Sequence, residues 1–236
     1  MKKWLLAVAL ALLLCPVARA DDADAPAQAC GIPADLVQSL QNKLRLVVQL
    51  NNGGIFSPNR MWSAVVDRNG TLCSVTKVGD AWPGSRAIAI AKAETGNDFS
   101  NSALSLSTAM LYAATQPGGS LWGLNESNPF NPKYLTETTQ GGPGTGVGHT
   151  PGGIITFGGG LALYSGGEVI GGLGVSGDSS CADHVIAYRM RRAAHLDDIP
   201  TGIMSSDNIQ YPPAGQQPTG FEQPHCFPQD LPPGQI

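Results

Sequence analysis

The chain has 236 residues, and its 18 acidic side chains outnumber its 14 basic ones, which gives a formal net charge of −4. An acidic chain has no electrostatic footprint for nucleic acid or for anionic membranes, so we exclude both as partners. The length suits one domain with added segments.

The N-terminus has the pattern of a secretory signal peptide. Two lysines precede an unbroken apolar run over residues 4–14, and small residues flank an arginine at 18–20. We expect cleavage after residues 1–20 and a mature chain that begins at Asp21, with a net charge of −7 once three basic residues are lost. The apolar run is shorter than the roughly 20 residues that a membrane span needs. A lipid anchor on Cys15 is the alternative, although two leucines precede it. We therefore expect a periplasmic or secreted protein without membrane insertion after cleavage.

Four cysteines follow the expected cleavage point: Cys30, Cys73, Cys181 and Cys226. An even number in an oxidising compartment favours two disulfides, for which three pairings exist. A metal site is the alternative, because Cys181 and His184 lie one helical turn apart and His225 adjoins Cys226. Structural zinc sites usually show tighter spacing on both sides. No C-x-x-C-H motif is present, which excludes covalent c-type haem.

The first half of the chain predicts a helix followed by a hairpin. Residues 21–31 are rich in Ala, Asp and Pro and predict a flexible leader. Pro33 begins a helix whose leucines and valines recur at helical spacing, and the Asn-Gly-Gly at 52–54 ends it. Two β-rich runs, 61–67 and 71–78, are joined by Asn-Gly, the strongest short-range hairpin signal.

The middle of the chain predicts two helices and a long loop. The helices are expected over 83–97 and 102–115. Gly, Pro, Asn and Thr then dominate a loop insertion over 116–158, and loops of this length usually form a lid, a binding loop or a subunit contact. Its large apolar side chains should cover the domain's own cleft or pack into a neighbouring subunit. We expect a homo-oligomer, most simply a two-fold dimer. These side chains are Leu121, Trp122, Phe130 and Tyr134.

The last part of the chain predicts a second hairpin, a helix and a tail. Runs 161–165 and 168–175 flank a Gly-Gly turn, and a helix follows over 179–195. An arginine cluster on that helix, at 189–192, indicates a solvated face, and pairing with ligand carboxylates or propionates is the alternative. Residues 197–236 are proline-rich and lack periodicity, which predicts an extended tail on the surface. The element order is α+β, with one antiparallel sheet covered by helices on both faces.

Short motifs in both halves together resemble the GlcG/HbpS-type haem-binding family. The motifs are A-V-V-D-R-N-G at 64–70, G-D-A at 79–81, I-A-K-A-E-T at 90–95, G-G-L-A-L-Y at 159–164 and G-G-L-G-V-S-G at 171–177. The resemblance covers roughly residues 34–195. It implies a domain over 32–196 with a profilin-like α/β/α arrangement and a five-stranded antiparallel sheet. Members commonly form dimers or larger rings, and several bind haem.

The resemblance implies an exported small-molecule binding protein, with haem or a related flat carboxylated molecule as ligand. The alternative is a non-catalytic accessory or structural subunit that docks on a periplasmic partner through the loop and tail. Haem degradation is implied by the family alone, because no acid/base or metal constellation supports enzymatic chemistry.

Candidate binding residues follow from the same resemblance. Relatives that use an axial histidine carry it on the first helix, which has none here, so His149 in the loop insertion is the expected ligand of the haem iron. Arg86 is expected to pair with a propionate. His184 is the second histidine candidate. Ser176 completes the set, although it also suits a turn that caps the last helix.

Two further motifs resemble functional patterns, but a structural role explains each of them better. The glycines of 171–177 satisfy G-x-G-x-x-G, but they follow a hairpin strand and better suit close packing of a helix on that strand than a dinucleotide. Asp178 stands where a G-x-S-x-G nucleophile elbow needs its second glycine.

The implied fold also suggests the disulfide pairing. It places the start of the first helix near the beginning of the second strand, and the start of the last helix within reach of the tail. We therefore expect Cys30–Cys73 and Cys181–Cys226.

Overall fold

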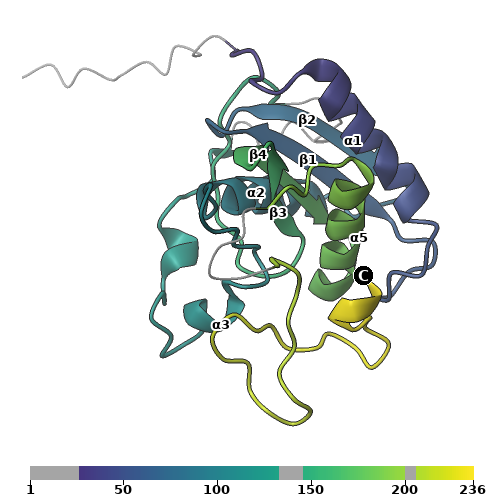
Figure 1. Cartoon of the computed structure of the whole chain (residues 1–236), viewed down its shortest axis with the longest axis vertical. Coiled ribbons are helices and arrows are strands. Elements are labelled where there is room, and N and C mark those ends of the chain that lie inside the picture. The colour runs from purple at the N-terminus through teal and green to yellow at the C-terminus, as the bar shows by residue number, and fades with distance from the viewer. Residues whose placement is uncertain (1–26, 133–145, 200–205) are drawn as a thin grey trace, which may run out of the picture.

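The computed structural model describes residues 27–132, 146–199 and 206–236, so the expected signal peptide 1–20 and Tyr134 lie outside the described residues. Within these ranges a sheet lies between helices on its two faces (Figure 1). No helix in the described ranges is long and apolar enough to cross a membrane.

The sheet has four antiparallel strands in the order β2-β1-β4-β3. The strands are β1 (Met61–Asp67), β2 (Leu72–Val78), β3 (Gly160–Ser165) and β4 (Glu168–Ser176). Both predicted hairpins are confirmed, β1 with β2 and β3 with β4. The β1–β4 pairing joins the two hairpins through the centre of the sheet.

The expected fifth strand is absent from the described residues, which corrects the five-stranded prediction. At the outer edge of β2, the Leu72 N–H donates to the His149 carbonyl (2.8 Å), and the Gly148 N–H donates to the Leu72 carbonyl (2.9 Å). This contact covers one residue and goes no further, because Gly146 and Gly148 have φ of +73° and +87°, outside the β region. At the other edge a single bridge joins Tyr164 to Asp197.

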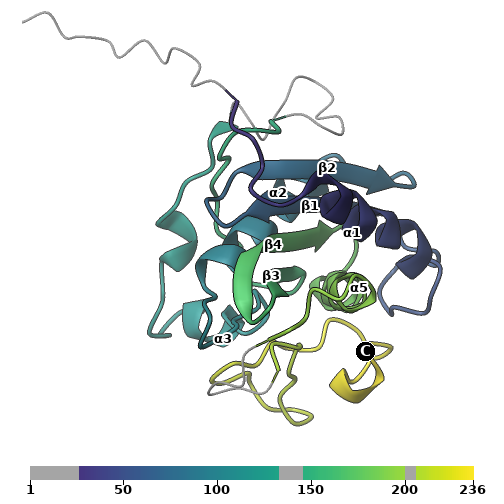
Figure 2. The same cartoon turned by 45° about the horizontal axis from the view of Figure 1, so that its top comes forward.

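Three long helices cover the sheet. Helices α1 (Ala34–Val47) and α5 (Ser180–Ala193) pack side by side on one face, and α2 (Ser85–Asp98) covers the other (Figure 2). Their bounds agree with the predicted helices to within a few residues. On the α2 face, a Cβ added at Gly172 or Gly174 would collide with the backbone of α2. These glycines therefore serve close helix packing, as the sequence reading favoured.

The helix predicted over 102–115 is wrong except at its end, where α3 (Tyr112–Thr115) forms a single turn. The Asn101 side chain accepts hydrogen bonds from the backbone N–H groups of Ala103 (2.8 Å) and Leu104 (2.9 Å). The Ser100 hydroxyl accepts another from the Leu106 N–H (3.0 Å). These side chains take donors that a helix would need, as Asn and Ser do in turns. A short 3-10 helix, η1 (Leu124–Glu126), follows in the loop insertion.

The described part of the tail, 206–236, lies beside α5 with several turns along its length and ends in the 3-10 helix η3 (Pro233–Gln235) (Figure 2). It is more than a surface wrapping, because Asp207 forms a fully buried ion pair with Arg191 of α5 at 2.6 Å. Arg191 was expected on a solvated helix face, and this expectation is wrong. The periodicity of α5 gave no sign that a distant acidic residue would allow the arginine to be buried.

Candidate functional site

A groove opens between α1 and β2 on the sheet face that α1 and α5 cover. We call it the α1–β2 groove, and its volume is about 820 Å³. This size falls in the range of small-molecule sites. Helix α1, the strand β2 and the segment before α1 line it; the polar members are Gln38, Gln41, Asn42, Arg45, Ser74 and Thr76.

The helical repeat places these polar side chains on α1. Leu40, Leu44 and Val47 are buried in the core that α1 shares with the sheet and α5. The polar lining residues recur at 38, 41/42 and 45, so they share the neighbouring face, which borders β2. Sequence reasoning missed this face because it searched for histidines, cysteines and acids. The three- and four-residue spacing of polar residues beside the apolar stripe was the available signal.

The electrostatics of the groove differ from those of the whole chain. Arg45 is the only charged residue in the lining, and the chain as a whole carries a net charge of −4. Among the residues that the structure describes, no acidic side chain forms an ion pair with Arg45. An exposed guanidinium without a partner can bind a carboxylate through two parallel hydrogen bonds.

The floor of the groove is fixed by Gln41, whose side chain is almost fully buried. Its Nε2 donates to the Ser63 carbonyl and to the Ser74 hydroxyl, both at 3.3 Å. The carbonyl partner fixes the orientation of the amide, because only the nitrogen can donate. These bonds tie α1 to β1 and β2, so the groove is formed before any ligand binds.

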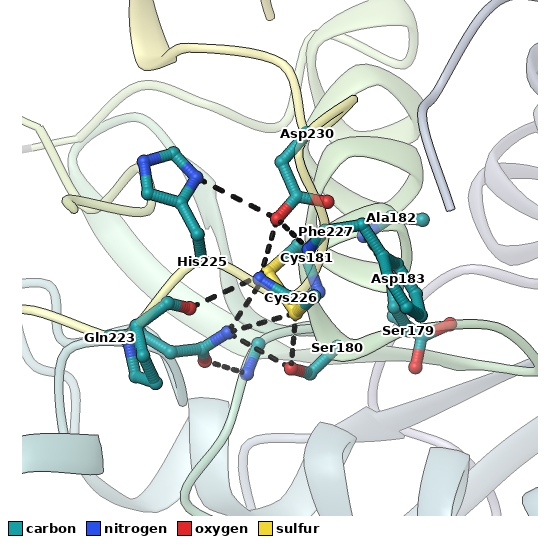
Figure 3. Close-up of a disulfide and its surroundings, with 12 residues drawn as sticks. Ser179, Ser180, Cys181, Ala182, Asp183, Gln223, His225, Cys226, Phe227 and Asp230 are labelled. Carbon is teal, nitrogen blue, oxygen red and sulfur yellow. Dashed lines mark hydrogen bonds and ion pairs between the residues drawn. A yellow bond between two sulfur atoms is a disulfide. The ribbon is translucent and has the colours of Figure 1, made fainter. Parts of the chain in front are cut away.

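Both expected disulfides are confirmed. The leader staple, Cys30–Cys73, has a Cα separation of 5.2 Å and lines one end of the groove. The tail staple, Cys181–Cys226, has a Cα separation of 6.0 Å and attaches the tail to the first turn of α5 (Figure 3). The alternative of a metal site built on Cys181 and His184 does not hold for this oxidised form.

The four candidate binding residues from the sequence are not brought together. His149 is half-buried, and its backbone pairs with Leu72, next to Cys73 at the leader-staple end of the groove. It is not among the lining residues. Arg86 is buried at the start of α2, on the other face of the sheet.

His184 and Ser176 lie in structural positions. His184 on α5 is fully buried, and burial lowers the pKa of its imidazole to about 3. Neither ring nitrogen has a hydrogen-bond partner among the described residues, and the ring stacks on Tyr188 at 6.2 Å between centroids. Ser176 is the last residue of β4 and pairs with Trp62, near the start of β1. The His149 backbone pairs instead with Leu72, which lies opposite Val66 at the other end of β1.

The turn that follows β4, at Gly177 and Asp178, is held by a buried ion pair. Lys92 of α2 contacts Asp183 of α5 at 2.7 Å, and both side chains are buried. Asp183 also accepts the N–H groups of Gly177 (3.1 Å) and Asp178 (3.0 Å). Burial raises the pKa of Asp183 to about 6, while Lys92 opposes the rise. Because this network joins helices on opposite faces through the turn, we assign it a structural role.

Comparisons with known proteins place the chain in a family. The family described as "Haem degrading protein HbpS-like" matches residues 57–191, more than half of the chain. The corrinoid adenosyltransferase PduO of Citrobacter freundii is 34% identical over 124 residues, which are 52% of this chain and 29% of that protein. The chain thus spans less than a third of this curated relative.

Two solved structures share the fold. The PduOC:heme complex is 26% identical with a TM-score of 0.52, over 71% of this chain and 98% of that one. The Klebsiella pneumoniae protein ORFY is 23% identical with a TM-score of 0.51, over 70% of this chain and 90% of that one, and this likeness concerns the fold alone. With the family match, the antiparallel sheet and the motifs on both hairpins, the chain belongs to the HbpS-like family.

Proposed function

We propose that this chain is an exported binding protein that holds haem, or a related flat carboxylated molecule, in the α1–β2 groove. The observation that carries the proposal is the pairing of a groove of about 820 Å³ with Arg45 as its only charged lining residue. In an acidic chain, this arrangement selects an organic anion.

The comparisons support haem as the ligand. The family description names haem, and PduOC, whose fold matches 71% of this chain, was solved as a complex with heme. Binding suits the groove better than degradation, because its lining has no carboxyl or imidazole group and its two cysteines form a disulfide. No side chain of the lining can therefore exchange a proton near neutral pH.

The lining fits the carboxylates of haem and leaves its iron without a ligand. None of the lining residues is a histidine, methionine or tyrosine. A donor for the iron must come from outside the lining, and His149, next to the leader-staple end, remains our proposed ligand. Arg86, His184 and Ser176 lie away from the groove and would act only if the ligand bound elsewhere.

Haem titration of the purified chain tests the proposal. We expect a Soret band that saturates at one haem per chain. Arg45→Gln should weaken haem binding about tenfold, the scale of one charge-assisted contact. Lys43→Gln, on the same helix outside the lining, is the matched control. His149→Ala should shift the Soret band without unfolding the chain. The absence of a Soret band, or equal affinities of the Arg45 and Lys43 variants, would reject binding in the groove.

An accessory subunit is the second candidate, and the loop insertion favours it. Trp122 is 65% exposed and Leu121 is 39% exposed. Exposed side chains of this size mark contact surfaces for a second copy or a partner protein. Light scattering at micromolar concentration separates the cases. A dimer whose mass falls to that of a monomer in Trp122→Ser supports a homo-oligomer, while a monomeric wild type rules out a contact between copies of this chain.

A further inference from the structure

The outer edge of β2 is open along most of its length (Figure 2). Within the described residues, Leu72 alone of this strand exchanges backbone hydrogen bonds with a segment outside the sheet. The opposite edge is covered at both ends of β3. There the Tyr164 N–H donates to the Leu196 carbonyl (2.9 Å), and the Thr108 N–H donates to the Gly160 carbonyl (3.0 Å). An open edge presents N–H and C=O groups with which another chain can pair.

The register of the sheet shows which groups of β2 face outward. The Val175 N–H of β4 donates to the β3 side, at 2.8 Å. Because successive residues of a strand direct their backbone groups to opposite sides, Gly174 is directed at β1, and its partner Ala64 is directed at β4. Ala64 also lies opposite Val75 of β2, so the N–H and C=O of Val75 point away from the sheet. The same alternation directs the backbone groups of Lys77 outward.

The α1–β2 groove runs along this open edge. Val75 belongs to its lining although the Val75 side chain packs in the core on the α2 face, so its backbone is what faces the groove. Ser74 and Thr76 alternate with it and line the groove with their side chains, and α1 supplies the amides of Gln38 and Asn42 on the other wall. An extended peptide binds in such a place by adding a strand to the edge, while its alternate side chains enter the groove.

Two cations flank the open edge. Arg45 belongs to the groove lining, and the Lys77 ammonium lies on the other face of the sheet, 5.2 Å from the centre of the Trp62 ring. Among the described residues, no acidic side chain forms an ion pair with either cation. A lysine on an edge strand disfavours pairing with a second copy, and two copies would each carry a net charge of −4. The charges therefore favour an acidic partner over a second copy of this chain.

We propose that the outer edge of β2 binds an extended acidic segment of a partner protein as an added antiparallel strand. The backbone of the segment pairs with Val75 and Lys77, and one of its side-chain carboxylates reaches Arg45 through the groove. The added strand is antiparallel because every pairing in this sheet is antiparallel, and such ladders are slightly more stable per residue. The proposal does not rest on haem binding, although the two ligands would share the groove and so exclude each other.

Peptide selection on the whole oxidised chain tests the proposal. Random dodecapeptides displayed on phage are selected, and a recovered peptide is synthesised with fluorescein for anisotropy titration. We expect it to carry an Asp or Glu among alternating β-branched residues. N-methylation of every second backbone nitrogen should abolish binding in one register and spare it in the other, because only alternate N–H groups of an added strand face β2. Recovery of no peptide, or equal effects of the two methylated forms, overturns the proposal.

Variants at Lys77 separate the backbone from the charge. Lys77→Pro removes an outward N–H, keeps the ladder to β1 and should weaken peptide binding at least about tenfold. Lys77→Gln, the matched control, keeps that N–H and should weaken binding less than about threefold. Arg45→Gln should weaken binding of the acidic peptide about tenfold and leave that of its amide analogue unchanged.

Circular dichroism checks that each variant is folded, and the methylated peptides decide the question if Lys77→Pro does not fold. Equal binding by the two Lys77 variants overturns the proposal. A dimer that Lys77→Pro converts to a monomer also overturns it, because a second copy would then occupy the edge.

Discussion

The leader staple and the tail staple close loops of nearly equal length, with cysteines 43 and 45 residues apart, yet they join different kinds of structure. The leader staple attaches an N-terminal segment to an edge strand and forms one end of the α1–β2 groove. The tail staple attaches a segment that already carries a buried ion pair to α5. One link shapes the groove that we propose as the ligand site, and the other reinforces a segment that also has polar contacts of its own.

The charges around the two staples differ in the same way. Asp67, beside the leader staple, adds to the repulsion on a second acid on α2: burial, followed by the charges of Asp98 and Asp67, raises the pKa of Glu94 to about 8. Near the tail the acids face cations. Burial alone would raise the pKa of Asp207, but the Arg191 guanidinium holds it below its ordinary value. The chain therefore tolerates buried carboxylates in two ways, by protonation on one side and by pairing on the other.

The largest expected effect breaks the pairing on the tail side. Asp207→Ala leaves the fully buried Arg191 without its partner, which should lower the free energy of unfolding by about 3–5 kcal/mol. Asp197→Ala is the control, because its contact with Arg192 is exposed and 4.0 Å long, and it should cost less than about 1 kcal/mol. Urea unfolding measures both. Equal losses in the two variants would show that the buried pair does not hold the tail.

Loss of either disulfide should lower the free energy of unfolding by a somewhat smaller amount. Loop closure of this length predicts that each double Cys→Ser variant loses about 2–4 kcal/mol of stability. Because the two loops match, loop entropy cancels in the comparison of the two variants. Any difference measured by denaturant unfolding then reports the native contacts that each segment loses. A loss confined to one variant would show that the other segment stays in place without its covalent link.

The buried Glu94 should make the stability of the chain depend on pH. The folded pKa of Glu94, about 8, lies above its ordinary 4.5, so between these values the folded chain keeps a proton that the unfolded chain has lost. Stability should therefore fall by up to about 1.4 kcal/mol per pH unit as the pH rises through this window. Glu94→Gln should remove this slope. Glu168→Gln, at an exposed position, should leave it unchanged, and a slope that persists in the Glu94 variant would refute the assignment.

Local patterns predicted most elements of the fold. The Asn-Gly dipeptide defined the first hairpin, and apolar spacing at 36–48 defined α1, because both signals depend only on neighbouring residues. The helix predicted over 102–115 does not form, because the side chains of Asn101 and Ser100 accept hydrogen bonds from backbone N–H groups. The amino-acid composition of the segment does not reveal these hydrogen bonds. The sequence also could not show that Arg191 would meet Asp207 across the tail.

The candidate site was predicted less well for a related reason. The search for reactive side chains selected His149, Arg86, His184 and Ser176, which the fold distributes over separate places. The polar residues that line the groove are instead amides, hydroxyls and Arg45, residue types that are common on any helix surface. Their position beside β2 depends on how α1 packs against the sheet. A local sequence pattern does not determine how a helix packs against a distant strand.

The smallest expected effect distinguishes the two staples by ligand binding, and it depends on the proposed function. Cys30→Ser/Cys73→Ser frees the segment that forms one end of the groove, so haem affinity should fall about tenfold through the added cost of ordering that segment. Cys181→Ser/Cys226→Ser should bind haem as the wild type does, because neither tail cysteine lines the groove. Haem titrations at a temperature where both variants remain folded measure the ratio. An equal loss in both variants would mean that the staples act through global stability, and an effect confined to the tail variant would place the ligand beside α5.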